Sequence, residues 1–182
     1  MKKTILIMFL PAIFTYWAYG QELKPNSIIK GNKISLKVDD IKTPGADFSS
    51  DRVYVANVNN IYHGRKPKIS AWDISLYQKM EKGSMLKAFG QVFNDTRLKE
   101  LASTDRGLAI FLYITPSGKV TEVGFLIRKN TALTTLEIEQ LENALKTDVT
   151  FKIQPKETKD GDFFIINMEV KYKNILDKEE FL

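Results

Sequence analysis

The stretch that most constrains the fold runs from Gly107 to Ile127 and reads GLAIFLYITPSGKVTEVGFLI. Apolar residues alternate with other residues in both halves of this stretch, at Leu108, Ile110, Leu112 and Ile114, and again at Val123, Phe125 and Ile127. A period of two is typical of a β-strand that buries one face. Proline and glycine between the two halves, in residues 115–118, favour a tight turn. The stretch therefore predicts an antiparallel hairpin.

The second face of the first strand is unusually aromatic for a surface that meets water, because it carries Phe111 and Tyr113. Between residues 84 and 101, apolar residues recur at helical spacing, with Met85 and Phe89 on one face. We expect these preceding helices to pack against the aromatic face of the hairpin. That packing would explain the aromatic residues without any ligand.

A helix is predicted directly after the hairpin, over residues 136–146. Thr134 stands three residues before Glu137, which is the spacing of a capping box. Ile138, Leu141 and Leu145 recur at helical spacing, so this face should lie on the hairpin. The residues predicted to face water are Glu137, Glu139, Gln140 and Lys146.

Alternation returns at residues 149–153 and again at residues 163–172. The order is then strand, strand, helix, strand, strand, which predicts an α+β fold with a helix packed on a small antiparallel sheet. A β-rich N-terminal arm and the preceding helices would complete it. Whether the strands of that arm extend the main sheet or form a separate flap is left open by periodicity.

The pattern from Gly107 to Tyr172, with its turn TPSGKVTEV and its strand start TFKIQP, resembles the C-terminal domain of TonB, found in periplasmic proteins of Gram-negative envelopes. The chain departs from that family in two places. The polar run before the helix is replaced by RKNTALTT, and no proline-rich linker precedes the module. The resemblance implies capture of a peptide by strand addition at a sheet edge, in a secreted relative rather than an energy transducer. A weaker resemblance is to a secreted family of gut anaerobes with no known activity.

The N-terminus is interpreted as a secretory signal peptide over residues 1–20. Lys2 and Lys3 precede a short apolar run, and Ala18-Tyr19-Gly20 supplies small residues before the expected cleavage point at Gln21. The run is too short for a membrane span, so we expect none after cleavage. We predict a β-rich segment over residues 21–82, the TonB-like module over residues 83–182, and a periplasmic or secreted protein. The sequence holds no cysteine, which fits that location without disulfides.

The last strand is the predicted peptide-binding edge, and the partner would be an envelope protein or a peptide. Its outward set would be Phe163, Ile165, Asn167, Glu169 and Lys171. An edge strand exposes unpaired backbone amides and carbonyls, which an extended peptide can pair with.

Two alternative functions remain open in the sequence. A cell-wall glycan could stack on aromatic residues, for which the candidates are Trp72, Tyr77, Phe111 and Tyr113. A hydrolase could use His63 with Asp73, although His63 is the only histidine. No metal site or cofactor is predicted, because the chain lacks the ligand spacing of zinc or calcium sites and the nucleotide-binding motifs. The net charge of +5 comes from scattered basic residues, which argues against nucleic acid as a partner.

Overall fold

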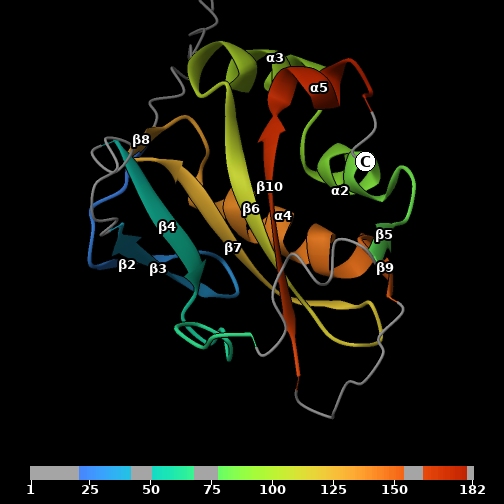
Figure 1. Ribbon diagram of the computed structural model, residues 1–182. Helices are drawn as coiled ribbons and strands as arrows, with labels where there is room; N and C mark the ends of the chain where they lie inside the picture. The colour runs from blue at the N-terminus through green and yellow to red at the C-terminus, as the bar shows by residue number, and fades with distance from the viewer. Residues whose placement is uncertain (1–20, 42–50, 68–77, 154–161, 180–182) are drawn as a thin grey trace, which may run out of the picture.

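The computed structural model describes residues 21–41, 51–67, 78–153 and 162–179, and these form an α+β fold. Its centre is a six-stranded antiparallel sheet in the order β10-β6-β7-β4-β3-β2 (Figure 1). These strands are β2 (Ser27–Lys30), β3 (Ser35–Asp40), β4 (Arg52–Asn57), β6 (Gly107–Ile114), β7 (Val120–Arg128) and β10 (Phe164–Lys171). The helices of the described residues are α2 (Ser84–Val92), α3 (Asp95–Thr104), α4 (Thr135–Asp148) and α5 (Tyr172–Leu176). Two small two-stranded sheets pair β1 (Gln21–Glu22) with β8 (Asn130–Thr131), and β5 (Gln78–Met80) with β9 (Phe151–Ile153).

The hairpin of β6 and β7 forms as predicted. The amide of Thr115 donates to the carbonyl of Lys119, and Gly118 closes the turn with φ +83°. Gly118 also lies against β9, since a Cβ added to it would lie 1.8 Å from the carbonyl oxygen of Phe151. The turn therefore needs glycine both for its backbone angle and for its space.

The N-terminal strands extend the main sheet, which resolves the open question about the arm. β4 pairs with β7, with Val53 opposite Ile127 and Val55 opposite Phe125. The strand after the helix behaves differently, because β9 pairs with β5 and not with the main sheet. A backbone bond from the amide of Phe151 to the carbonyl of Gly118 holds β9 at the hairpin turn. Residues 78–80 form β5, and residues 68–77 before it lie outside the described residues.

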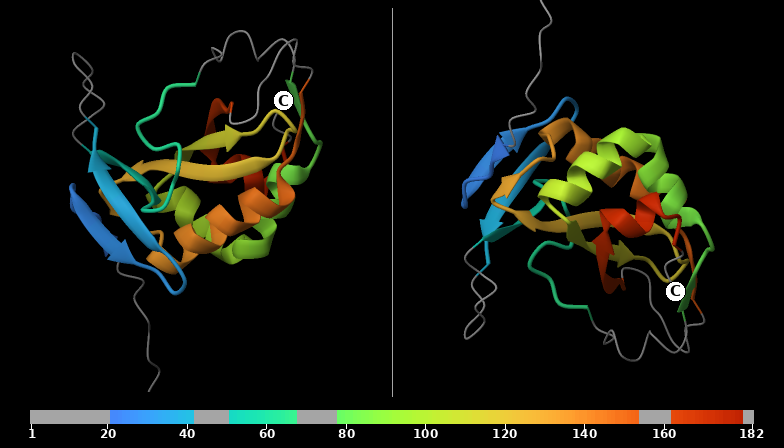
Figure 2. Two further views of the ribbon diagram at one scale, coloured as in Figure 1. Left: turned by 90° about the horizontal axis from the view of Figure 1, so that it is seen from below. Right: turned by 90° about the horizontal axis from the view of Figure 1, so that it is seen from above.

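The main core lies between one face of the sheet and the helices α2, α3 and α4, which Figure 2 shows on the same side of the sheet. α4 begins with the predicted capping box between Thr134 and Glu137. Its predicted apolar face is confirmed, since Ile138, Leu141 and Leu145 are each at most 1% exposed. Burial of such side chains is the main force that holds a helix on a sheet.

The prediction that the preceding helices cover the aromatic face is wrong. Met85 and Phe89 of α2 belong to the same core as Ile110 and Leu141, on the α4 side of the sheet. Phe111 and Tyr113 point to the opposite side, because side chains alternate along β6. There the segment 58–67 lies over the sheet (Figure 2). Helical periodicity shows that a helix has an apolar face but does not say which face of a sheet it covers.

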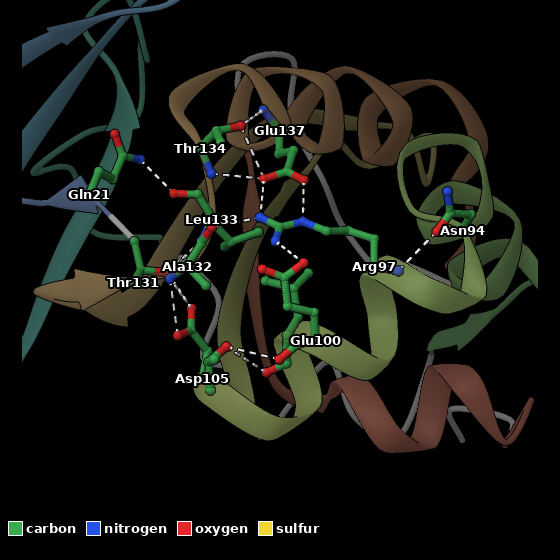
Figure 3. Close-up of polar contacts among 12 residues, drawn as sticks. Gln21, Asn94, Arg97, Glu100, Asp105, Thr131, Ala132, Leu133, Thr134 and Glu137 are labelled. Atoms are coloured by element: carbon green, nitrogen blue, oxygen red, sulfur yellow. Dashed lines mark hydrogen bonds and ion pairs between the residues drawn. The ribbon is translucent and has the colours of Figure 1, made fainter. Parts of the chain in front are cut away.

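A polar cluster fastens α3 to the start of α4 (Figure 3). Nε of Arg97 lies 2.7 Å from Oε1 of Glu137, and the same guanidinium donates to the carbonyl of Ala132. Burial alone would raise the pKa of Glu137, but the hydrogen bonds from Arg97 and Thr134 outweigh it and lower that pKa. Asp105 accepts hydrogen bonds from the Thr131 hydroxyl and the amide of Ala132. The cluster is structural, because its charges are satisfied by one another and by the backbone.

The expected signal peptide, residues 1–20, lies outside the described residues. Across the described ranges, the helices are all too short or too polar to cross a membrane.

Candidate functional site

β10 lies at one end of the six-stranded sheet, where the sequence analysis placed its candidate edge. It pairs along its whole length with β6, from Phe164 opposite Ile114 to Lys171 opposite Gly107. On its other side, no strand of the described residues pairs with it. β10 is eight residues long, whereas β2, at the opposite end of the sheet, has four.

Two contacts at the C-terminal end of β10 show which of its backbone amides and carbonyls face β6. The amide of Tyr172 donates to the carbonyl of Arg106 at 3.1 Å. A Cβ added to Gly107 would lie 2.3 Å from the carbonyl oxygen of Val170, so this oxygen also faces β6. Along an antiparallel strand, residues whose backbone groups form hydrogen bonds with the neighbouring strand alternate with residues whose backbone groups do not. The even-numbered residues of β10 therefore bond to β6, and the odd-numbered ones present their backbone groups to the open side.

The outward-bonding residues are Ile165, Asn167, Glu169 and Lys171, which belong to the edge set named from the sequence. The last three are exposed, while Ile165 is half-buried. Phe163, the remaining member of that set, is only 4% exposed and packs beneath Tyr62. It is therefore a support for the edge and not an exposed part of it. In the described residues, no ion pair involves Glu169 or Lys171.

The second face of the sheet carries an aromatic cluster near the start of β10. Tyr62, Tyr113 and Phe163 are buried together, with Phe111 and Ile165 partly buried against them. The ring of Tyr62 stacks on Phe163 with centroids 4.2 Å apart, and the guanidinium of Arg65 lies 5.7 Å from both ring centroids. These contacts bind the segment 58–67 to the sheet. Of the four aromatic candidates, Tyr113 is buried, Phe111 is half-buried, and Trp72 and Tyr77 lie outside the described residues.

A groove of about 620 Å³ lies beside this cluster on the same face. Its walls include Tyr54, His63, Phe111, Leu126 and Asp39. The hydroxyl of Tyr54 lies 2.9 Å from that of Tyr113, and burial together with this hydrogen bond raises the pKa of Tyr54. Gly124 makes room for the Tyr54 side chain, because a Cβ added there would lie 2.0 Å from the hydroxyl oxygen.

His63 stands in this groove and not alone on the surface. Its ring stacks on Tyr54 with centroids 5.9 Å apart, and its Nε2 lies 3.2 Å from Oδ2 of Asp39. That contact has the distance of an ion pair but not the alignment of a hydrogen bond. Asp73, its proposed partner in a hydrolase, lies outside the described residues. Within the described ranges, no three side chains of the metal-binding types are grouped as a metal site requires.

Two buried carboxylates on α4 were missed by the sequence analysis. Glu139, predicted to face water, is only 8% exposed, and it accepts hydrogen bonds from the amides of Asn32 and Lys33 at 2.6 and 2.9 Å. Glu142 accepts from Lys146 at 2.6 Å. Burial of Lys146 disfavours its charge, but hydrogen bonds to Glu142 and Glu122 outweigh this and raise its pKa. These contacts hold the β2–β3 turn and β7 against the helix.

The comparisons with known proteins bear on the fold. No protein-family model matches the chain, and no curated protein sequence matches it. A solved structure that is similar to this one is the crystal structure of a DUF5043 family protein from Bacteroides uniformis ATCC 8492. The two share 18% sequence identity with a TM-score of 0.60, over 84% of this chain and 88% of the other. At that identity, the likeness shows a shared fold and nothing about activity.

Proposed function

We propose that the protein binds an extended peptide segment of a partner protein, which adds as a strand beside β10. The observation that carries the proposal is the row of backbone groups at Ile165, Asn167, Glu169 and Lys171, which point away from β6. Among the described residues, no hydrogen bond meets the amides of this row, whereas the carbonyl of Lys171, the N-cap of α5, accepts the first bond of that helix. An added strand would satisfy the remaining groups in the way that known β-augmentation complexes do.

Two further features favour β10 over the opposite edge at β2. β10 is twice as long, so it offers a longer ladder to a peptide. It also carries half-buried apolar side chains, Ile165, Ile166 and Met168, which an added strand would cover. The exposed charges of Glu169 and Lys171 reduce unspecific pairing of this edge with other strands.

The resemblance to the TonB C-terminal domain supports the same proposal. In that reading, β6, β7, α4 and β10 correspond to the strand, strand, helix and last strand of the module, and β9 has moved onto β5. In this proposal the protein is non-catalytic and binds an envelope protein or peptide. Its signal peptide exports it to the periplasm or beyond the cell.

The test is selection from a displayed library of random nine-residue peptides, followed by binding measurements on variants. In Asn167→Pro the lost amide faces the open side, where proline is compatible with an edge strand. The variant should therefore fold, as checked by circular dichroism, and should lose peptide binding at least tenfold.

The matched control for this variant is Ile28→Pro on β2. The amide of Gly31 donates to the carbonyl of Ile34, so by alternation the amide of Ile28 also faces away from its sheet neighbour. This control should bind peptide normally. Normal binding by folded Asn167→Pro would contradict strand addition at β10.

A cell-wall glycan is the second candidate ligand, because the groove beside the aromatic cluster has a volume of about 620 Å³ and Phe111 forms part of its wall. Phe111→Ala should then abolish retention on insoluble peptidoglycan and leave peptide binding at β10 intact. Retention that is unchanged in this variant would reject the groove as a glycan site.

A further inference from the structure

On the second face of the sheet, the side chains along β10 differ from one end of the strand to the other. At the N-terminal end, Ile165 packs on Tyr113 and Phe163, so this end is apolar. At the C-terminal end, Glu169 and Lys171 are exposed, and neither is in an ion pair with a described residue. On the opposite face, Ile166 and Met168 are half-buried at the rim of the main core.

These positions set the chemistry of a neighbouring strand, because residues opposite one another in a sheet project to the same face. A peptide residue opposite Ile165 would contact the apolar end, and one opposite Glu169 would contact the exposed carboxylate. The two positions are four residues apart. The peptide residues beside Ile166 and Met168 would point to the helix side and extend the core there.

We propose that the segment recognised at β10 is an amphipathic strand with a basic residue opposite Glu169 and an apolar residue four positions away, opposite Ile165. The inference rests on the proposed strand addition and names the class of peptide. Aliphatic residues fill the alternate positions, which face Ile166 and Met168. Charge complementarity at Glu169 and apolar contact at Ile165 together fix the register of the peptide.

A second copy of this chain can place a basic residue opposite Glu169 only in a register that pairs few residues. In an antiparallel pair that places Glu169 opposite Lys171 of a second copy, residue 168 lies opposite residue 172. Because α5 begins at Tyr172, the strand pairing would stop there, after three residues of each copy. A separate peptide can pair along the whole of residues 165–171.

The test compares two fluorescein-labelled nine-residue peptides by fluorescence anisotropy with the full-length protein. Both peptides alternate valine and threonine, and both carry one leucine. They differ at the position four residues from this leucine, where one peptide has lysine and the other has glutamate. The parent protein should bind the lysine peptide about two- to fivefold more tightly, as expected for one cross-strand ion pair. The preference should reverse with Glu169→Lys and should shrink in 0.5 M salt.

The matched control is Glu22→Lys, which changes the net charge equally at an exposed position on β1 and should keep the parent's preference. A third peptide, with leucine and lysine only two positions apart, should bind more weakly than the first. Equal affinity for the lysine and glutamate peptides, or a preference that survives Glu169→Lys, would overturn the proposed class while strand addition stands. Failure of every peptide to bind would overturn both, and so would a dimer of the protein that Asn167→Pro dissociates.

Discussion

A single methyl group should have opposite effects at two glycines of this fold. At Gly118, alanine would have to keep φ near +83° and would place its Cβ 1.8 Å from the carbonyl oxygen of Phe151. The left-handed conformation alone costs about 1–2 kcal/mol, and the clash with backbone adds to it. At Gly90, in the exposed last turn of α2, the same Cβ meets nothing within 4 Å. There alanine should stabilise by about 0.5–1 kcal/mol, because it restricts the unfolded chain and favours helix.

Urea denaturation of Gly118→Ala and Gly90→Ala against the parent measures both effects. We expect a loss of about 2 kcal/mol or more at Gly118, or a fall in Tm of at least about 4 °C, and a rise of about 1–4 °C at Gly90. If Gly118→Ala were as stable as the parent, the hairpin turn and β9 would not be in contact. A shift of the same sign in both variants would refute the reasoning from space and backbone angle.

Two further predictions concern α4. Leu141 is 1% exposed, so Leu141→Ala should lower the free energy of unfolding by about 2–5 kcal/mol. Leu136 is 47% exposed, so Leu136→Ala should change it by no more than about 0.5 kcal/mol. Similar losses for the two variants in chemical denaturation would mean that the helix face is misassigned. The pKa of Glu137 is lowered in the fold, so its carboxylate stabilises above the ordinary value near 4.3 and loses that effect as the pH falls through the folded-state value. The stability difference between the parent and Glu137→Gln should therefore be largest near pH 7 and shrink below about pH 4, and a difference independent of pH would contradict the account.

The parts of the fold that the sequence predicts are those whose signals are local. The hairpin turn depends on residues 115–118, and the capping box depends on Thr134 and Glu137, three residues apart. The alternation of β6 identifies its core face without reference to any other segment. Each of these patterns is fixed by backbone geometry within a few residues.

The burial of Glu139 could not be read from helical spacing, because its partners lie far away in the chain. The carboxylate accepts from the amides of Asn32 and Lys33, more than 100 residues earlier. A helix wheel places Glu139 beside charged neighbours and predicts exposure. Gly31, where a Cβ would lie 2.0 Å from Oε2 of Glu139, is the one sequence sign of this close approach.

Local sequence patterns also could not predict which segment covers the aromatic face of the sheet. Tyr62 reaches Tyr113 and Phe163 from an irregular segment without periodicity. The direction of the backbone groups on β10 likewise depends on the register with β6, which periodicity does not specify. The sequence could nominate β10 as an edge strand, but only its pairing shows which residues present free amides.

The most direct test of strand addition is amide hydrogen exchange along β10, measured by NMR with and without a selected peptide. In the free protein, the amides of Ile166, Met168 and Val170 should be protected by β6, while those of Ile165, Asn167 and Glu169 exchange quickly. Saturating peptide should protect the second set at least tenfold and leave the first set unchanged. Peptide binding that leaves the amides of Ile165, Asn167 and Glu169 unprotected would contradict the proposal that β10 receives the added strand.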